Sequence, residues 1–335
     1  MGSTSHAHES EQFFGLQTPI ELPHDHALDA FHRGLDRAKA KKGKVRILQF
    51  GASHTAADLW TGHFRKLMQK RFGDGGLGFI MPVRPWRYYR HDGIRFEHPK
   101  RKKYRWKWDF IRSKPKKKMV NFRLGLAGMR VSARKRRQWS RLFTTTGGRG
   151  RMQMEFFYEK KRGGGDLLLT IDEKKHRRIR TRRRKRGLGS RKFDMKYKPH
   201  SILLRPRGNG EVQLYGAVIE RDQPGVVVDT LGINGARARS ILKWNPKRWS
   251  ELLRRRKPDL VILAYGTNEA MDTNEPIRIY REKLHAVLRH LKQTVPKSSC
   301  LLIGPTDHPL VHRESKEDEM PWFEHRSRTD DIIRV

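Results

Sequence analysis

The stretch that decides the fold is Lys44-Val-Arg-Ile-Leu-Gln-Phe-Gly51-Ala52-Ser53-His54-Thr55. Five of the seven residues from Val45 to Gly51 are apolar or glycine, which predicts a buried strand. An amphipathic helix should follow, with an apolar face made of Leu59, Trp60, Phe64, Leu67 and Met68. Ser53 is then expected beside a helix N-terminus, where free backbone N–H groups can stabilise an oxyanion. The alternative is a turn in which Ser53 only caps the helix.

The same order of strand, glycine-containing turn and helix returns in the second half of the chain. Apolar strands are predicted over 226–229, 258–265 and 299–303, followed by turns at 232–235, 266–269 and 304–308. Alternating strands and helices predict a parallel sheet with helices on both faces. The carboxyl ends of its strands share one edge, so we expect this edge to gather Ser53, Gly232, Asn268 and Asp307. A hydroxyl nucleophile surrounded by amide donors suits acyl transfer.

The middle of the chain has another pattern. Short β-type runs at 152–158, 166–172, 201–204 and 211–219 alternate with basic segments, which predicts an inserted β-sandwich module. We therefore divide the chain into an N-terminal lead-in (1–43), a first α/β part (44–95), a basic β-rich insert (96–224) and a second α/β part (225–335). A helix that opens near Thr329 is expected to be cut off at Val335, so this second part is expected to be truncated.

Charge is concentrated in the insert. The net charge is +40, and residues 101–200 carry 36 Lys and Arg against 7 Asp and Glu. Such a block favours a polyanionic partner, which could be a nucleic acid, an acidic glycan or an anionic membrane surface, and the alternative is a solvated face without a partner. Its basic runs are expected in loops or at the edges of sheets, where charge discourages pairing between molecules.

The cysteine content and the lengths of the apolar runs limit the kinds of site and of membrane segment that the chain can contain. The single cysteine, Cys300, is expected as an inert thiol in a buried strand, and one cysteine cannot form a disulfide framework or a cysteine-rich zinc site. We expect no cofactor and no metal. No apolar run approaches the ~20 residues that span a bilayer, and the N-terminus lacks the apolar core of a signal peptide. As written, the chain is expected in the cytoplasm.

Three of these turns resemble the blocks of the SGNH (GDSL-type) esterase family. The stretches 51–54, 231–236 and 265–269 are similar to its nucleophile turn, its second block and its third block. The resemblance implies a three-layer, flavodoxin-like α/β fold and a carboxylic ester hydrolase. It implies Ser53 as nucleophile, with the oxyanion held by the N–H of Ser53, the N–H of Gly232 and the side-chain amide of Asn268.

The resemblance extends to the insert. Residues 96–224 are similar to the carbohydrate-binding-module-like sandwich of bacterial envelope members such as peptidoglycan O-acetylesterases. This implies an acylated polysaccharide or a small ester as substrate, and removal of acetyl groups as the reaction. It also implies the periplasm or cell envelope as the location if the N-terminus is incomplete.

Two departures from the family pattern concern catalysis. Ala52 stands where the family has Asp, and the family's Asp-x-x-His block, which supplies the base, is absent after residue 269. Without a base a serine hydroxyl is a poor nucleophile. The candidate substitutes are His308, which follows Asp307 directly, and His54. The chain is thus expected to be part of an esterase, or a catalytically impaired relative that binds an anionic glycan or nucleic acid through its insert.

Overall fold

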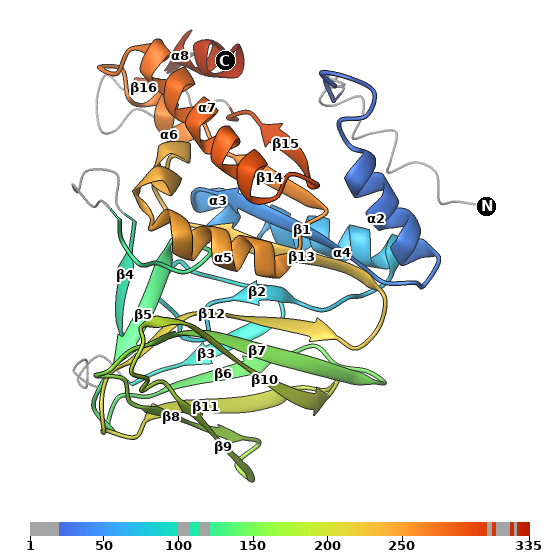
Figure 1. The fold of residues 1–335 in the computed structure, drawn as a ribbon. Coiled ribbons are helices and arrows are strands. Elements are labelled where there is room, and N and C mark those ends of the chain that lie inside the picture. Colours follow the sequence, from blue (N-terminus) through green and yellow to red (C-terminus); the bar gives the residue numbers. More distant parts are fainter. Residues whose placement is uncertain (1–19, 100–106, 114–120, 307–309, 313–321, 325–326) are drawn as a thin grey trace.

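A four-stranded parallel sheet forms the centre of the α/β part (Figure 1). In the computed structural model, which describes residues 20–99, 107–113, 121–306, 310–312, 322–324 and 327–335, its order is β13-β1-β14-β15. These strands are β13 (Gly225–Gly232), β1 (Lys44–Gly51), β14 (Leu260–Ala264) and β15 (Ser299–Ile303). Gly51 lies opposite both Gly232 and Ala264, and Ala264 lies opposite Ile303. The predicted α/β class is confirmed, and the four strands end together at one edge.

Helices cover both faces of this sheet, which gives the expected three layers (Figure 1). One face packs against α2 (Asp29–Lys39) and α4 (Trp60–Phe72), and the other against α5 (Pro246–Arg256) and α7 (Ile277–Thr294). The alternation of side chains along β1 explains this arrangement, because Val45 and Ile47 point to the first layer and Leu48 and Phe50 to the second. Short helices lie at the carboxyl edge: α3 (Ser53–Ala56), the 3-10 helix η2 (Ala238–Lys243), α6 (Thr267–Ala270) and α8 (Ser327–Ile333). None of the described helices is long and apolar enough to cross a membrane.

Two antiparallel sheets form the inserted sandwich (Figure 1). The inner sheet contains β10 (Gly187–Lys196), β7 (Arg151–Lys160), β12 (Val212–Arg221), β5 (Met129–Ala133) and β4 (Asp109–Arg112), and β2 (Gly78–Ile80) pairs with β12. The outer sheet contains β3 (Ile94–Glu97), β6 (Ser140–Thr144), β11 (His200–Pro206), β8 (Asp166–Ile171) and β9 (Lys175–Arg180). A separate hairpin joins β16 (Leu310–His312) to β17 (Trp322–Glu324). The inserted sandwich is confirmed, and β2 and β3 join its sheets by pairing with β12 and β6.

Buried ion pairs join the sandwich to the parallel sheet. Glu220 of β12 accepts hydrogen bonds from Lys44 at 3.0 Å and from Arg46 at 2.9 Å. Arg256 of α5 lies 2.9 Å from Glu220 and donates to Asp229 of β13 at 2.6 Å. Burial alone would raise the pKa of Glu220, but the charges of Arg256, Arg46 and Lys44 hold this pKa well below its ordinary value. The insert is therefore fixed to the α/β part by charge as well as by apolar contact.

The helix expected directly after Ser53 differs from the prediction. It is two helices, α3 and α4, because the chain turns between them at Asp58, which has a positive φ of 53°. Phe64 and Met68 pack on the sheet as predicted, whereas Leu59, Trp60 and Leu67 are exposed. The physical reason is the buried ion pair between Asp58 and Arg65, which turns the Arg65 face of α4 inward.

Cys300 also differs from the prediction. Strand β15 is an edge strand of the parallel sheet, and the Cys300 side chain on it is exposed rather than buried. The apolar run 299–303 thus predicts the strand correctly, but it does not show whether both faces of the strand are covered.

Candidate active site

Ser53 lies at the carboxyl edge of the parallel sheet, as predicted. It is the first residue of α3, its side chain is half-buried, and its carbonyl accepts the N–H of Ala57 at 3.0 Å. The turn before it requires glycine, because a Cβ on Gly51 would lie 2.1 Å from the hydroxyl oxygen of Thr55. Over the described ranges no side chain hydrogen-bonds to the Ser53 hydroxyl, which leaves this hydroxyl available to a substrate.

Gly232 ends β13 directly opposite Gly51. A Cβ on Gly232 would lie 2.1 Å from the backbone nitrogen of Ala56, so only glycine lets α3 pack this closely on β13. Three residues later, Gly235 has a φ of 73° and no atom within 4 Å of the place where a Cβ would lie. Gly235 was not singled out from the sequence. The sequence feature that could have indicated this residue is its place as the second glycine of the turn 232–235.

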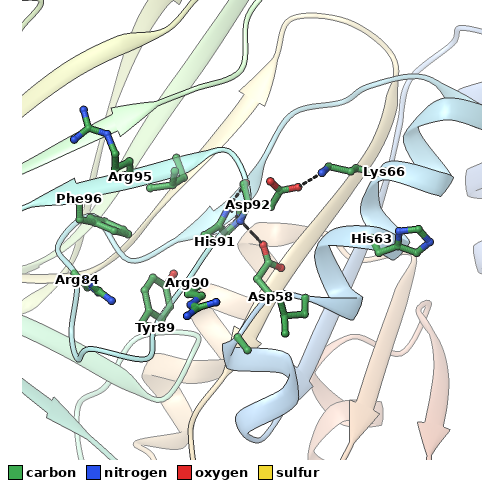
Figure 2. A pocket seen from close by; sticks show the side chains of 13 residues that line it. Asp58, His63, Lys66, Arg84, Tyr89, Arg90, His91, Asp92, Arg95 and Phe96 are labelled. Atoms are coloured by element: carbon green, nitrogen blue, oxygen red, sulfur yellow. Dashed lines mark hydrogen bonds and ion pairs between the residues drawn. The ribbon is translucent and has the colours of Figure 1, made fainter.

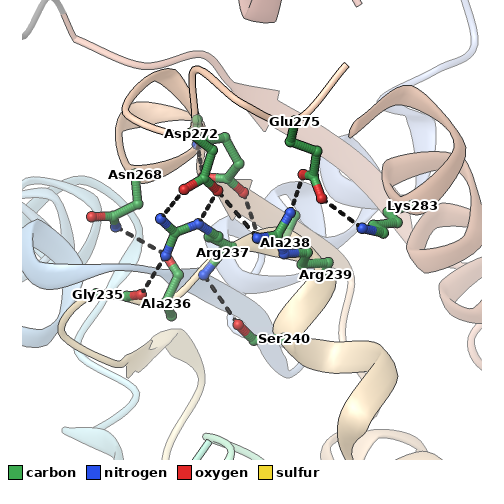
Figure 3. Close-up of polar contacts among 12 residues, drawn as sticks. Gly235, Ala236, Arg237, Ala238, Arg239, Ser240, Asn268, Asp272, Glu275 and Lys283 are labelled. Atoms are coloured by element: carbon green, nitrogen blue, oxygen red, sulfur yellow. Dashed lines mark hydrogen bonds and ion pairs between the residues drawn. The ribbon is translucent and has the colours of Figure 1, made fainter. Parts of the chain in front are cut away.

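Asn268 lies on α6 and contacts the loop that follows β13 (Figure 3). Its Nδ2 donates to the carbonyl oxygen of Ala236 at 2.9 Å. The next residue, Glu269, is buried and accepts the N–H of Ala238 at 2.7 Å and the N–H of Gly266 at 3.1 Å. Burial raises the pKa of Glu269 above its ordinary value. These contacts join the turns after β13 and β14, as the shared edge predicts.

Arg237 adds an ion pair to the same junction. Its guanidinium is paired with Asp272, which follows α6, and Arg239 pairs with both Asp272 and Glu275 (Figure 3). Lys283 of α7 reaches Glu275 at 2.8 Å. The loop carrying Gly235 is therefore held on α6 and α7 by charge as well as by the amide of Asn268.

A buried polar cluster holds α3 in place from the other side. The Asp58 carboxylate accepts hydrogen bonds from Arg65 at 2.6 Å, from the hydroxyl of Thr230 at 2.7 Å and from the N–H of Asp92 at 2.6 Å. Burial alone would raise the pKa of Asp58, but the neighbouring His91 and Arg65 and these hydrogen bonds bring this pKa below its ordinary value. The cluster joins the α3–α4 corner to β13 and to the loop before β3.

The general base is not assigned by these contacts. His54 is exposed and makes no side-chain hydrogen bond within the described ranges, and Asp307 and His308 lie outside the described residues. A buried histidine, His91, has its Nδ1 2.8 Å from the carbonyl oxygen of Asp92 and 3.8 Å from Asp58. Burial lowers the pKa of His91, and its side chain is enclosed, so we assign it to structure rather than to proton transfer. In the part of the chain that the structure describes, no three His, Cys, Asp or Glu side chains gather around a possible metal position.

Comparisons with known proteins give one family match and one strong structural match. A model of the GDSL-like Lipase/Acylhydrolase family matches residues 201–329, a range that includes Gly232 and Asn268 but not Ser53. A solved structure of a peptidoglycan O-acetylesterase superposes with a TM-score of 0.70 at 21% identity, covering 91% of this chain and 78% of that chain. A family two carbohydrate esterase from Cellvibrio japonicus reaches a TM-score of only 0.21 at 12% identity, over 58% of this chain and 78% of that one. No curated protein matches the sequence.

The two matches cover different parts of the chain. The family match rests on sequence and covers the second α/β part, whereas the structural match covers both α/β parts together with the sandwich. The chain therefore shares its fold with a solved peptidoglycan O-acetylesterase, and its residues 201–329 match the GDSL-like lipase/acylhydrolase family.

Proposed function

We propose that the protein removes acetyl groups from a polysaccharide, with Ser53 as the nucleophile. The Ser53 oxygen attacks the carbonyl carbon of the ester and forms a tetrahedral oxyanion. The bond to the sugar oxygen then breaks, the sugar hydroxyl leaves with a proton, and water hydrolyses the acetyl-serine to acetate. The observation that carries this proposal is the register of β1, β13 and β14, which brings Ser53 and Asn268 to one edge.

Three groups are proposed to hold the oxyanion. The Ser53 N–H lies at the start of α3, where backbone N–H groups lack intrahelical partners. The Asn268 amide has two N–H bonds, of which one is used on Ala236, so the second is free for an oxyanion. This arrangement aims a fixed dipole at developing negative charge.

The third donor is a backbone N–H of the turn after β13. Gly232 is the residue that the family resemblance implies. The N–H of Ile233 points toward β1, where it donates to Gly51 at 3.1 Å, and neighbouring N–H groups of a strand point to opposite sides. The N–H of Gly232 accordingly points away from β1, and Gly235 in the open turn is the alternative donor.

The test is hydrolysis of a small acetyl ester and of an acetylated polysaccharide by the chain and by Ser53→Ala. We expect Ser53→Ala to lose at least about 1,000-fold in kcat, because removing a nucleophile leaves only binding and oxyanion stabilisation. Ser201→Ala, on strand β11 of the outer sheet, is the matched serine control and should keep full activity. Equal rates for the chain and Ser53→Ala would overturn the assignment of Ser53.

The second candidate function is binding of an anionic glycan or nucleic acid by the insert. It is favoured by one observation, a groove of about 760 Å³ on the sandwich whose cations include Lys174, Lys175, Arg177, Arg191 and Lys192. Over the described ranges none of these five side chains is paired with a carboxylate. If the insert has this function, we expect it to bind heparin or DNA independently of Ser53. The association constant should fall by about one log unit per log unit of salt concentration for each anionic group that is neutralised.

A further inference from the structure

A pocket of about 560 Å³ opens beside the nucleophile helix (Figure 2). We call it the loop pocket, and its lining residues include Ala57, Arg84, Tyr89, Arg90 and Phe96. Ala57 is one helical turn from Ser53, to whose carbonyl it donates at 3.0 Å. The N–H of Arg90 donates to the carbonyl of Ala56 at 3.3 Å, so the wall of this pocket is attached directly to α3.

The carboxylates of the loop pocket are already neutralised. Asp58 is buried and paired with Arg65, and Asp92 is paired with Lys66 at 2.8 Å. Arg95, another lining residue, is paired with Glu97 at 3.0 Å outside the pocket. The carboxylates of Asp58 and Asp92 are therefore not available to balance other cationic side chains of the loop pocket.

Among the arginines that line the loop pocket, Arg84 and Arg90 make no ion pair with a carboxylate of the described residues. The Nη2 of Arg84 donates a hydrogen bond to the carbonyl of Arg87. The Nε of Arg84 is shielded from solvent and has no hydrogen-bond partner among the described residues. Arg84 and Arg90 line the same pocket, and burial and the charge of Arg90 lower the pKa of Arg84. A bound anion would relieve the repulsion between these two cations.

The pocket also offers an apolar surface on which a sugar ring can pack. Tyr89 and Phe96 have ring centroids 6.1 Å apart, and Figure 2 shows the Tyr89 ring beside the side chains of Arg84 and Arg90. Tyr89 is buried, and its hydroxyl accepts the N–H of Met81 at 2.8 Å, so the half-buried Phe96 is the aromatic residue that presents surface to the pocket. Aromatic and cationic groups thus line one cavity.

We propose that the loop pocket binds a carboxylate of the acylated substrate through Arg84 and Arg90, while the ester lies at Ser53. Guanidinium groups recognise carboxylates through paired, charge-assisted hydrogen bonds. The substrate class is then an O-acetylated glycan that contains an acidic sugar. This inference rests on the proposed esterase function and adds the substrate's charge to it.

The kinetic test compares two substrates that differ only in charge. One is an O-acetylated uronic acid glycoside, and the other is the same compound with its carboxylate converted to a primary amide. We expect the acid to have the lower KM, and Arg90→Gln, an exposed residue, to raise that KM about 10- to 100-fold with little change in kcat, as expected for one charge-assisted hydrogen bond. The KM for the amide substrate should be the same with and without the Arg90→Gln substitution.

Arg87→Gln is the matched control, because Arg87 is exposed and stacks on the Tyr88 ring at 4.5 Å without lining the pocket. A binding measurement separates this proposal from the proposed function. Ser53→Ala is titrated calorimetrically with the unacetylated uronic acid glycoside and with its amide, and neither requires turnover. Tighter binding of the acid that is lost in Ser53→Ala/Arg90→Gln supports the subsite. Equal binding of acid and amide, or no effect of Arg90→Gln, overturns it.

Discussion

Glu269 accepts the backbone N–H of Ala238 at 2.7 Å and so joins helix α6 to the loop that follows β13. The same carboxylate accepts the N–H of Gly266, the residue between β14 and α6. One buried side chain therefore fixes two of the three turns that carry the proposed oxyanion donors. It does so without lying among those donors itself.

We predict that Glu269→Ala lowers kcat for a small acetyl ester by about 10- to 100-fold, because small displacements of positioned groups cost that much. KM should change little. Glu269→Gln keeps one acceptor oxygen and should recover part of the rate. Thermal melting of both variants provides the check on folding. A Glu269→Ala variant that melts lower but keeps its kcat would show that the residue contributes to stability alone.

Asn268→Ala is expected to lower kcat by about 100- to 1,000-fold, the usual effect of losing one oxyanion donor. Asn268→Asp should be at least as harmful, since a carboxylate oxygen replaces the N–H and carries negative charge. Steady-state kinetics on a small acetyl ester measure both. Asn209→Ala, in the sandwich, is the control for loss of an asparagine amide. Unchanged kcat in Asn268→Ala would remove this residue from the proposed site.

Breaking the charge cluster between the sandwich and the sheet should destabilise the whole protein. Glu220→Gln leaves the buried Arg256 without one of its two carboxylates, and we expect a loss of about 3–5 kcal/mol in the free energy of unfolding. Glu97→Gln removes a surface pair with Arg95 and should cost about 1 kcal/mol or less. Urea denaturation compares the two variants. Similar losses for both would contradict a special role for the buried cluster.

Acid should unfold the protein through the same carboxylates. The pKa values of Glu220 and Asp58 are lowered in the folded state, so the unfolded chain binds more protons than the folded one in acid. Their contribution is complete above the ordinary carboxyl pKa of about 4 and is lost as the pH falls below it. Denaturation at pH 7, 5, 4 and 3 should show a constant contribution down to about pH 5 and a decline below. In Glu220→Gln the decline should be shallower, and an equal slope in both proteins would contradict this assignment.

The sequence predicted those features that depend on local pattern. The apolar run before Ser53 became β1, and Ser53 and Asn268 follow strands that end at the same edge because parallel strands align their carboxyl ends. The charged run that includes 177–180 was expected in a loop or at a sheet edge, and it forms the edge strand β9.

The remaining features depend on partners that are distant along the chain. Leu59 and Leu67 are exposed because Arg65 is drawn inward by a carboxylate and by Thr230 of β13, more than 160 residues away. Strands β2 and β3 are short, and their pairing with β12 and β6 decides that they belong to the sandwich. Nothing in the sequence distinguishes Arg84 and Arg90 from the other arginines, since their lack of carboxylate partners is a property of the folded molecule.

The pairing of Lys44 with Gly225 also sets an order for folding. Strands β1 and β13 are neighbours in the sheet, yet the entire sandwich separates them along the chain. Closing so long a loop from a disordered insert carries an entropic cost, whereas a folded sandwich holds its own ends together by pairing Gly78 with Ile219. We therefore expect the sandwich to fold first and to bring β1 to its partner β13. Slow or faulty folding of the insert will delay the assembly of the active site, even where no insert residue contacts a substrate.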